Sequence, residues 1–405
     1  MEKTQEIWET LQKKRWKVLI ASCFVIFCNG SLYAWSAFAG PMANYLSQCT
    51  GGEITSLAIV FTMANAVGPV TMIGGGYIND KLGPKGVLLA GGLLFGAGMI
   101  GSGFAKSVGM LIASYSLGVG LGGGLIYGTV TSNAVKFFPD KGGMVGGIIT
   151  ACYGTSSIII PPIATWLAEN YGVTTAFRVI GGAMLCIICM AAFVIEPYPK
   201  GTQKDETMEG EYTCLEMLRH PTFYLMLLTL TCGAFAGMMI ISQASQIAQG
   251  MMGFSVQAAT LVVSGLALFN TLGRLTSGVL SDGLGASKTL KLCFLGSLAA
   301  GLLLFFCKEN TAALFCAGLA VVGFCFGGIM GIYPGFTAKQ FGRRNNSMNY
   351  GVMFVGFALA GLLGPWIMNT VVRMTGRYQP AFLASASLAM AGIGLLCWFD
   401  AMTKE

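Results

Sequence analysis

One arginine lies inside a stretch of sequence that is otherwise apolar. Arg274 belongs to an apolar run that begins near Phe254, and the next charged residue along the chain, Asp282, comes eight residues later. In a helix this separation is about 12 Å, so the guanidinium would lie well inside a membrane-spanning segment. A charge at such a depth costs several kcal/mol unless a partner compensates it, and residues of this kind commonly mark a functional site.

The residues around Arg274 supply no acidic partner. Asn270 lies one turn away on the same helical face, whereas no Asp or Glu stands at helical spacing. The planar guanidinium presents several donors that match a carboxylate in a bidentate arrangement. We therefore expect Arg274 to bind an anion that arrives from outside, with Asn270 contacting or orienting the same group. The alternative is a structural cation bonded to backbone carbonyls or to Asn and Gln side chains.

The elements that would position Arg274 are membrane-spanning helices. Of the 405 residues, 54% are hydrophobic and only 10% are charged, which excludes an ordinary soluble domain. Long apolar runs repeat along the chain and predict an all-α polytopic membrane protein with twelve transmembrane helices. The expected spans are approximately residues 17–40, 56–78, 85–105, 108–132, 143–168, 174–195, 222–247, 254–280, 288–307, 311–337, 347–372 and 380–399.

The basic residues predict how these spans are oriented. When the spans alternate across the membrane, 18 of the 24 Lys and Arg residues fall on the side of the two termini and five fall on the other side. Because basic residues concentrate in cytoplasmic loops, both termini are expected in the cytoplasm. The net charge of +7 thus reflects the ends of the spans and does not indicate nucleic-acid binding.

The two halves of the chain are related. The segment from Gly76 to Gly83 recurs 202 residues later from Gly278 to Gly285, and a glycine-rich segment before Tyr127 has a counterpart before Tyr333. This displacement is close to half the chain, which indicates a duplication of six spans. In such folds the substrate usually binds near the midplane of the membrane, between the halves.

We expect two pseudo-symmetric six-helix bundles, residues 1–196 and 222–405, joined by a cytoplasmic linker over residues 197–221. The linker is polar and contains two prolines in its first three residues, and it is expected to be helical only around residues 214–219.

The repeated loop motif resembles that of the major facilitator superfamily. It consists of Gly76, Asp80, Lys81 and Gly83 after the second span, and a partial copy with Asp282 follows the eighth. Within the superfamily, further residues resemble the oxalate/formate antiporter family: Tyr33 and Trp35, Tyr127, Asn270 and Arg274, and Tyr333. The resemblance covers nearly the whole chain. It implies the major facilitator fold, secondary transport of small carboxylates by alternating access, and a location in the cytoplasmic (inner) membrane of a bacterium.

The aromatic residues of these motifs are candidates for the substrate site. Tyr127 and Tyr333 occupy equivalent positions in the fourth and tenth spans, where their hydroxyls could contact a carboxylate from both halves. Tyr33 and Trp35 would line the same cavity from the first span. For each of these residues, packing in the helical interior is the alternative.

The loop motif is expected to control conformation and not to bind substrate. The Asp80 carboxylate can cap a helix N-terminus or pair with a cytoplasmic Lys or Arg, which would hold one conformation in place. Gly76, Lys81, Gly83 and Asp282 are assigned to the same switch; a helix-end charge without such a role is the alternative for Asp80.

One departure from the family bears on the charge of the substrate. In family members specialised for oxalate, the eleventh span carries a pocket lysine, and the matching position here is Phe357. One buried cation suits one carboxylate, whereas a dianion would leave a charge uncompensated. We therefore expect a small monocarboxylate such as lactate, pyruvate or formate. An oxalate or dicarboxylate antiporter and a transporter of another small solute are the alternatives, and a non-transporting membrane sensor is a remote one.

The remaining features point away from enzymatic chemistry. The chain contains no Gly-Lys dipeptide, so a Walker A loop is excluded, and its single histidine, His220, has no ligand partners in sequence. We expect no catalytic residue, metal or cofactor, no nucleic-acid partner and a monomer in the lipid bilayer. Transport would be anion exchange or symport with a proton.

Overall fold

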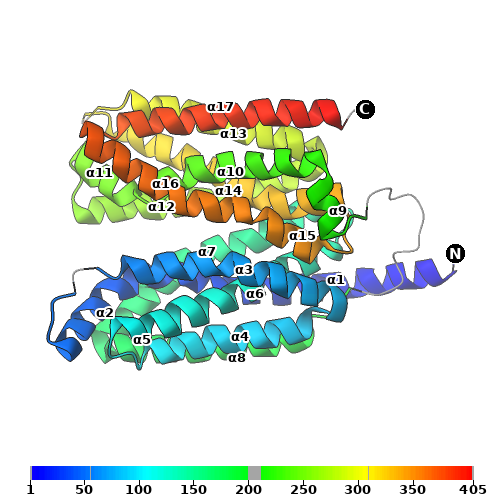
Figure 1. The fold of residues 1–405 in the computed structure, drawn as a ribbon, viewed down its shortest axis with the longest axis horizontal. Coiled ribbons are helices and arrows are strands. Elements are labelled where there is room, and N and C mark those ends of the chain that lie inside the picture. The colour runs from blue at the N-terminus through cyan, green and yellow to red at the C-terminus, as the bar shows by residue number, and fades with distance from the viewer. Residues whose placement is uncertain (1, 55, 199–210, 309, 404–405) are drawn as a thin grey trace. The chain divides into compact units, whose positions relative to one another are not determined.

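The computed structural model describes residues 2–54, 56–198, 211–308 and 310–403 (Figure 1). Twelve helices in these ranges are long and apolar enough to cross a membrane, and the described residues form no β-strand. This confirms the predicted all-α polytopic fold with twelve spans.

The first six spans are built from ten helical elements, because the first and fourth spans each consist of three consecutive helical segments. In chain order the elements are α1 (Glu2–Gly30), η1 (Ser31–Ala34), α2 (Trp35–Thr50), α3 (Ala58–Leu82), α4 (Pro84–Ser102), α5 (Val108–Leu111), η2 (Ile112–Val119), α6 (Gly120–Lys136), α7 (Gly142–Tyr171) and α8 (Val173–Val194). The first span, Lys13–Thr50, is longer than predicted because the helical path continues from α1 through η1 into α2.

The last six spans follow a short helix within the predicted linker. The elements are α9 (Cys214–Arg219), α10 (Pro221–Ile241), α11 (Ala244–Met252), α12 (Val256–Leu284), α13 (Ala286–Phe305), α14 (Ala312–Phe341), α15 (Asn346–Met353), α16 (Val355–Thr375) and α17 (Gln379–Met402). Helix α9 covers the residues predicted to be helical in the linker. The eleventh span is broken at Phe354, between α15 and α16.

Two glycines end corresponding spans in the same way. Gly83 joins α3 to α4 and Gly285 joins α12 to α13, and both have φ of 90°. A side chain rarely tolerates this backbone conformation, so glycine is required where one span stops and the next begins at once. The same conformation at positions 202 residues apart supports the internal duplication.

The chain forms two compact units, each of which includes a short segment from the other half of the sequence. The first unit contains the helices from α1 to α6, α7 from Cys152 onward, α8, and the segment Thr337–Val352 with most of α15. Helix α4 packs against α8 and α6, and α3 packs against α6. Small residues permit this packing: a Cβ at Gly122 of α6 would lie 2.7 Å from the carbonyl oxygen of Gly91 in α4.

The second unit contains the first part of α7, Asp140–Ala151, the chain from Leu215 to Phe336, and the chain from Met353 onward. Helix α10 packs against α16 and α17, and α13 packs against α17. The core of this unit includes the fully buried rings of Phe294, Phe315 and Phe382.

The predicted division into residues 1–196, 197–221 and 222–405 stays a prediction. Residues 199–210 of the predicted linker lie outside the described residues.

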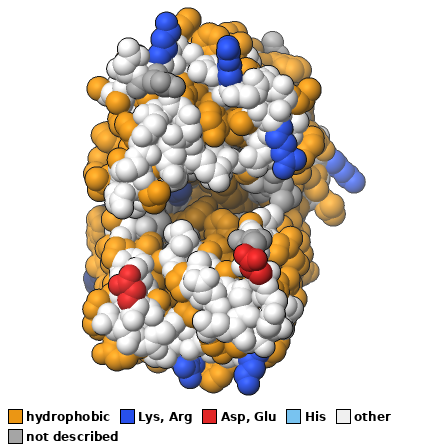
Figure 2. Space-filling view, turned by 90° about the vertical axis from the view of Figure 1, so that its left-hand side faces the viewer, with side chains coloured by type: hydrophobic (Ala, Val, Ile, Leu, Met, Phe, Trp, Pro, Cys, Tyr) orange, Lys and Arg blue, Asp and Glu red, His pale blue; other side chains and the backbone are white. Residues whose placement is uncertain are grey.

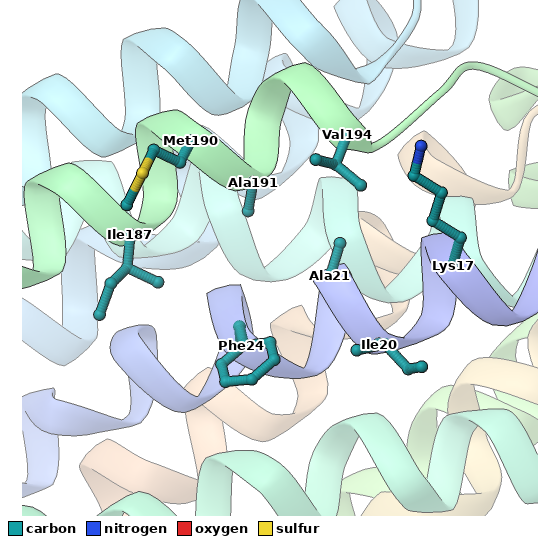
Figure 3. A pocket seen from close by; sticks show the side chains of 8 residues that line it. All are labelled: Lys17, Ile20, Ala21, Phe24, Ile187, Met190, Ala191 and Val194. Carbon is teal, nitrogen blue, oxygen red and sulfur yellow. The ribbon is translucent and has the colours of Figure 1, made fainter.

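The outer surface is largely apolar. In Figure 2 hydrophobic side chains dominate the sides of the molecule, whereas charged side chains are sparse. Large apolar residues are strongly exposed on several spans, for example Leu261 at 74% and Trp366 at 63%. An apolar groove between α1 and α8 also opens on the surface (Figure 3). Apolar surface of this extent suits contact with lipid, and the chain is a multi-pass membrane protein.

Candidate functional site: a buried arginine and two helix-end carboxylates

Arg274 lies in α12, at a point where two neighbouring helices approach very closely. A Cβ at Gly147 of α7 would be 2.4 Å from the Arg274 carbonyl oxygen, and one at Gly331 of α14 would be 2.7 Å from the same atom. Both neighbours must therefore be glycine for α12 to sit this deep between α7 and α14. The close packing leaves Arg274 only 7% exposed.

The guanidinium is held by two neutral acceptors. Its Nε donates to the Asn270 Oδ1 at 2.8 Å, one turn earlier in α12, and its Nη1 donates to the carbonyl oxygen of Thr150 in α7 at 3.2 Å. Asn270 thus acts as an acceptor that orients the arginine. These contacts are of the kind that a structural cation makes, but they leave the positive charge without a counter-charge.

No acidic side chain pairs with Arg274 among the described residues, whose ion pairs involve other cations. A guanidinium has five N–H donors, and two are used here. None of the Arg274 nitrogens is among the described side-chain atoms that are both buried and without a partner. Nη2, which makes neither of these two bonds, is therefore not fully enclosed by protein.

Three tyrosines form a ring cluster in the first unit. Tyr153 of α7 makes edge contacts with Tyr33 of η1 at 5.4 Å and with Tyr127 of α6 at 5.5 Å between ring centroids. The structure thus brings Tyr33 and Tyr127 together through a residue that the motifs did not include. Tyr127 is mostly buried and Tyr33 is half-buried.

Two predicted aromatic residues lie in the helical interior. Trp35 is 6% exposed and packs against Tyr115 with a centroid separation of 4.6 Å, in a cluster apart from Tyr33. Tyr333 is fully buried, and its hydroxyl donates to the carbonyl oxygen of Met226 in α10 at 2.8 Å. Both side chains are thus enclosed by protein in this conformation, and their assignment to the substrate site stays a prediction.

Phe357 lies on α16, just after the break in the eleventh span. It is half-buried, and its ring stacks on that of Phe354 at 4.6 Å. The side chains at this point of the eleventh span are therefore aromatic and uncharged.

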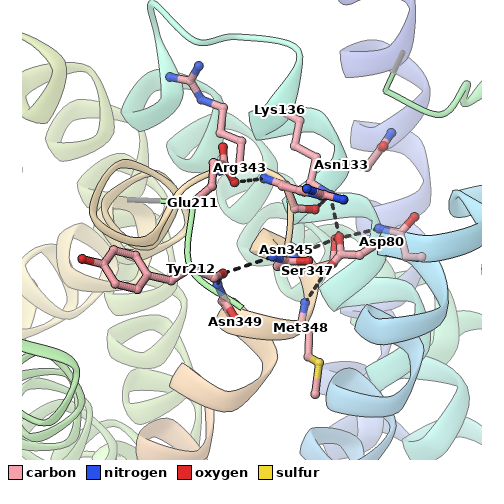
Figure 4. Close-up of polar contacts among 12 residues, drawn as sticks. Asp80, Asn133, Lys136, Glu211, Tyr212, Arg343, Asn345, Ser347, Met348 and Asn349 are labelled. Atoms are coloured by element: carbon pink, nitrogen blue, oxygen red, sulfur yellow. Dashed lines mark hydrogen bonds and ion pairs between the residues drawn. The ribbon is translucent and has the colours of Figure 1, made fainter. Parts of the chain in front are cut away.

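Asp80, near the end of α3, is buried and makes two kinds of contact (Figure 4). Its Oδ1 pairs with the Lys136 Nζ of α6 at 2.5 Å, with both side chains less than a tenth exposed. Its carboxylate also accepts from the backbone N–H of Ser347 at 3.4 Å and of Met348 at 3.0 Å, in the first turn of α15. A carboxylate at a helix N-terminus satisfies backbone donors that have no partner within the helix.

Other residues hold the segment that leads into α15. The Glu211 carboxylate accepts from the backbone N–H groups of Arg343 at 3.1 Å and Arg344 at 2.8 Å. The Tyr212 carbonyl accepts from the side-chain amides of Asn345 and Asn349, at 3.2 and 3.1 Å. The start of α15 is therefore fixed by α3, by α6 and by the chain that precedes α9 (Figure 4).

Asp282 occupies the equivalent place in the second unit. Its two carboxylate oxygens accept from the backbone N–H groups of Gly143 and Met144, both at 2.7 Å, in the first turn of α7. Unlike Asp80, Asp282 is exposed and has no cation partner among the described residues. The two caps therefore have the same geometry and different electrostatics.

The glycines of the loop motif make the two caps possible. A Cβ at Gly76 would lie 2.5 Å from the Ser347 carbonyl oxygen, and one at Gly278 would lie 2.5 Å from the Gly143 carbonyl oxygen. In contrast, Lys81 points along its own helix, where its ammonium lies 4.3 Å from the centre of the Tyr77 ring.

The residues missed from sequence are those whose role depends on distant partners. Thr150 acts through its backbone carbonyl, which carries no signal in sequence, and Tyr153 lies outside the aromatic motifs. Lys136 had a weak signal, since it is a single cation at the end of a polar run in the fourth span.

The twelve apolar spans found among the described residues define a multi-pass membrane protein. A sequence model of the Major Facilitator Superfamily matches residues 18–365 and 227–405, and the chain belongs to this superfamily. Its members are transporters and not enzymes.

Several known proteins are similar in sequence over most of their length. The chain is 30% identical to the oxalate:formate antiporter of Oxalobacter formigenes, over 94% of this chain and 90% of that protein. It is 29% identical to an uncharacterized MFS-type transporter, YhjX, of Escherichia coli K12, over 87% of each chain. Monocarboxylate transporter 13 of Rattus norvegicus is 24% identical over 80% of this chain and 74% of that protein.

Solved transporter structures share the fold. The MFS transporter FucP, in its outward conformation, superposes with a TM-score of 0.74 at 15% identity, covering 94% of this chain and 98% of that one. The human organic anion transporter MFSD10 gives a TM-score of 0.75 at 14% identity, covering 94% and 99%.

Proposed function

We propose that this protein carries small monocarboxylate anions across the membrane by alternating access, with Arg274 as the residue that binds the carboxylate. The observation that carries the proposal is the state of this arginine. It is nearly buried, its two partners are neutral, and its Nη2 makes neither of these bonds and is not fully enclosed. A carboxylate is the ligand that a guanidinium matches best, because two parallel hydrogen bonds form between them.

Binding of the anion would also drive the transport cycle. An unpaired guanidinium is costly to bury, whereas a guanidinium paired with a carboxylate is less so. A bound substrate therefore lowers the free energy of the closed state through which the site passes from one side of the membrane to the other. This mechanism yields anion exchange directly; in proton symport the proton would travel with the substrate or by water.

The expected substrate is a monoanion because Arg274 is the one cation assigned to the site. Phe357, which we match from sequence to the pocket lysine of oxalate-specialised family members, is uncharged and stacks on Phe354. The names of two relatives, an oxalate:formate antiporter and a monocarboxylate transporter, support a small carboxylate as the cargo.

Oxalate exchange is the second candidate, since the oxalate:formate antiporter is 30% identical over nearly the whole chain. Uptake of labelled lactate, formate and oxalate into proteoliposomes distinguishes the two functions. Faster uptake of oxalate than of either monoanion would favour the second candidate.

The test of the proposed site is to replace Arg274. We expect Arg274→Gln to abolish carboxylate uptake, and Arg274→Lys to retain little of it, because an ammonium does not reproduce the planar fork. The matched control is Arg373→Gln, an exposed arginine in the last turn of α16, which should transport at the wild-type rate. Wild-type uptake by correctly folded Arg274→Gln would refute the assignment.

For the loop motif, we propose that Asp80 is a conformational latch. Its pairing with Lys136 and its capping of α15 join three segments that are distant in sequence. A structural latch of this kind acts on the rate of conformational change and leaves the affinity of the substrate site largely unaltered.

A further inference from the structure

A groove on the surface of the first unit runs between α1 and α8 (Figure 3). Its volume is about 540 Å³, which is within the range of roughly 300–1,000 Å³ that is typical of ligand sites. The lining residues are Lys17, Ile20, Ala21 and Phe24 of α1 and Ile187, Met190, Ala191 and Val194 of α8. Seven of these eight side chains are apolar, and the eighth is a lysine.

The shape of the groove suits a hydrocarbon chain. The two helices run antiparallel, so the groove extends from Lys17 beside Val194 to Phe24 beside Ile187 (Figure 3). Seven residues of helix correspond to about 10 Å, which fits within the ~15 Å hydrocarbon depth of one leaflet of a bilayer. Ala21 and Ala191 form the floor and are 8% exposed, whereas Phe24 at 59% and Met190 at 63% form the open walls.

Positive charge gathers at one end of the groove. Lys17 is exposed and forms no ion pair or hydrogen bond with the residues that the structure describes. It belongs to a basic run with Lys13, Lys14 and Arg15, in which Lys14 is paired with Glu196 at 2.6 Å. Basic clusters directly outside a membrane span attract anionic lipid headgroups.

Two further features place this end at the membrane surface. Trp16 is 47% exposed within the basic run, and tryptophan is enriched where hydrocarbon meets the headgroups. Lys85 of α4 lies over the Phe193 ring of α8 at 4.4 Å, on the same end of α8 as Val194. Basic side chains at this end and the apolar walls of the groove match a molecule with an anionic head and an apolar tail.

From this arrangement we propose that the α1–α8 groove binds an anionic phospholipid, with an acyl chain along its apolar walls and the phosphate paired with Lys17. A soluble anion has no apolar part that could cover the walls, and a lipid without net charge would be attracted less strongly by the lysine. All lining residues of the groove belong to the first unit, whereas Arg274 belongs to the second.

The test is competition between lipids of different charge. The purified full-length protein is incubated with equal amounts of phosphatidylglycerol and phosphatidylcholine that carry identical acyl chains, and native mass spectrometry measures the fraction of protein that retains each lipid. We expect the protein to retain about five times more phosphatidylglycerol than phosphatidylcholine, because one lysine near the headgroup attracts an anionic lipid by about this factor. Lys17→Gln should remove the preference. Lys288→Gln, which changes an exposed lysine at the start of α13 that does not line this groove, should keep it.

A second variant tests the apolar walls. Ala21→Leu fills the floor while Lys17 is retained, so it should reduce retention of both lipids. Equal retention of the two lipids by the wild-type protein, or an unchanged preference in Lys17→Gln, would overturn the proposal. A thermal unfolding curve for each variant shows whether the fold is intact, and the Lys17 result stands even if Ala21→Leu is poorly folded.

Discussion

At the scale of single residues, a buried cation can bind an anionic ligand only if its protein partners hold it in place without neutralising its charge. Arg274 donates to one amide oxygen and one backbone carbonyl, which hold the guanidinium in place without neutralising it. An acidic partner would make the site more stable when empty and would compete with the substrate. Neutral acceptors therefore position Arg274 and leave its charge for the carboxylate that we propose as its ligand.

Replacing the amide of Asn270 by a carboxylate tests this reasoning. In Asn270→Asp, a negative charge would lie where the Asn270 Oδ1 now accepts from Arg274 at 2.8 Å. A pair of charges at about 4 Å interacts by roughly 4 kcal/mol near a protein surface, so we expect substrate affinity to fall by a factor of about 10–100 or more. Substrate binding can be measured by calorimetry or by competition for uptake.

The matched control for this variant is Asn170→Asp. Asn170 is exposed at the end of α7 and donates to the carbonyl oxygen of Trp166, so the change should not affect substrate affinity. Unchanged affinity in Asn270→Asp would show that Arg274 does not contact the substrate.

Replacing Phe357 by lysine tests the charge of the substrate. Phe357→Lys adds a cation at the position that we match to the lysine of oxalate-specialised relatives. A dianion can satisfy two cations, whereas a monoanion leaves one unpaired, so preference should shift toward oxalate. Competition by lactate and by oxalate against a labelled monocarboxylate, measured in both proteins, gives the shift. If wild type already prefers oxalate, the argument from a single cation fails.

At the scale of elements, two helices are capped by a carboxylate in the same way, but the two contacts differ in stability. Asp80 caps α15 and pairs with Lys136 in a buried setting, whereas Asp282 caps α7 at an exposed position. Removing one partner of a buried ion pair costs on the order of 3–5 kcal/mol, while loss of an exposed helix cap costs about 0.5–2 kcal/mol. The α3–α15 contact is therefore the stronger of the two.

Gly76 allows a direct test of the contact between α3 and α15. In Gly76→Ala the new Cβ would lie 2.5 Å from the Ser347 carbonyl oxygen, so the helices must separate and weaken the bonds to Asp80. We expect turnover to fall by about tenfold while equilibrium substrate binding stays close to wild type. Asp80→Asn should also lower turnover more than it lowers binding. Initial rates of uptake and binding titrations measure the two quantities.

Gly74→Ala is the control for this pair, since a Cβ at Gly74 meets nothing within 4 Å. It should transport like wild type. Parallel loss of binding and turnover in Gly76→Ala and Asp80→Asn would place the latch in the substrate site and contradict the proposed role.

At the scale of the whole molecule, the distribution of basic residues predicts that both termini face the cytoplasm. The end of α2 would then lie outside the cell, where Cys49 is exposed and free. A membrane-impermeant maleimide added to intact cells should label the wild-type protein, and Cys49→Ser should lose that label. Labelling of Cys49 only after the cells are opened would reverse the orientation.

The sequence by itself determined the features that depend on local composition. Runs of apolar residues predicted twelve spans, because a bilayer of fixed thickness demands helices of matching length and hydrophobicity. The displacement of 202 residues between Gly83 and Gly285 predicted a duplication, and both glycines adopt the same backbone conformation. The depth of Arg274 in an apolar run singled it out before any partner was known.

Only the tertiary structure decided which distant groups meet. Lys136 pairs with Asp80 across 56 residues of sequence, and the Thr150 carbonyl reaches Arg274 across 124. The tyrosines show the same limit: Tyr127 joins a ring cluster through Tyr153, whereas Tyr333 donates its hydroxyl to the Met226 carbonyl. Periodicity places a side chain on a face of its helix. What that face meets depends on how closely the helices approach, and here glycines at a few crossing points set that approach.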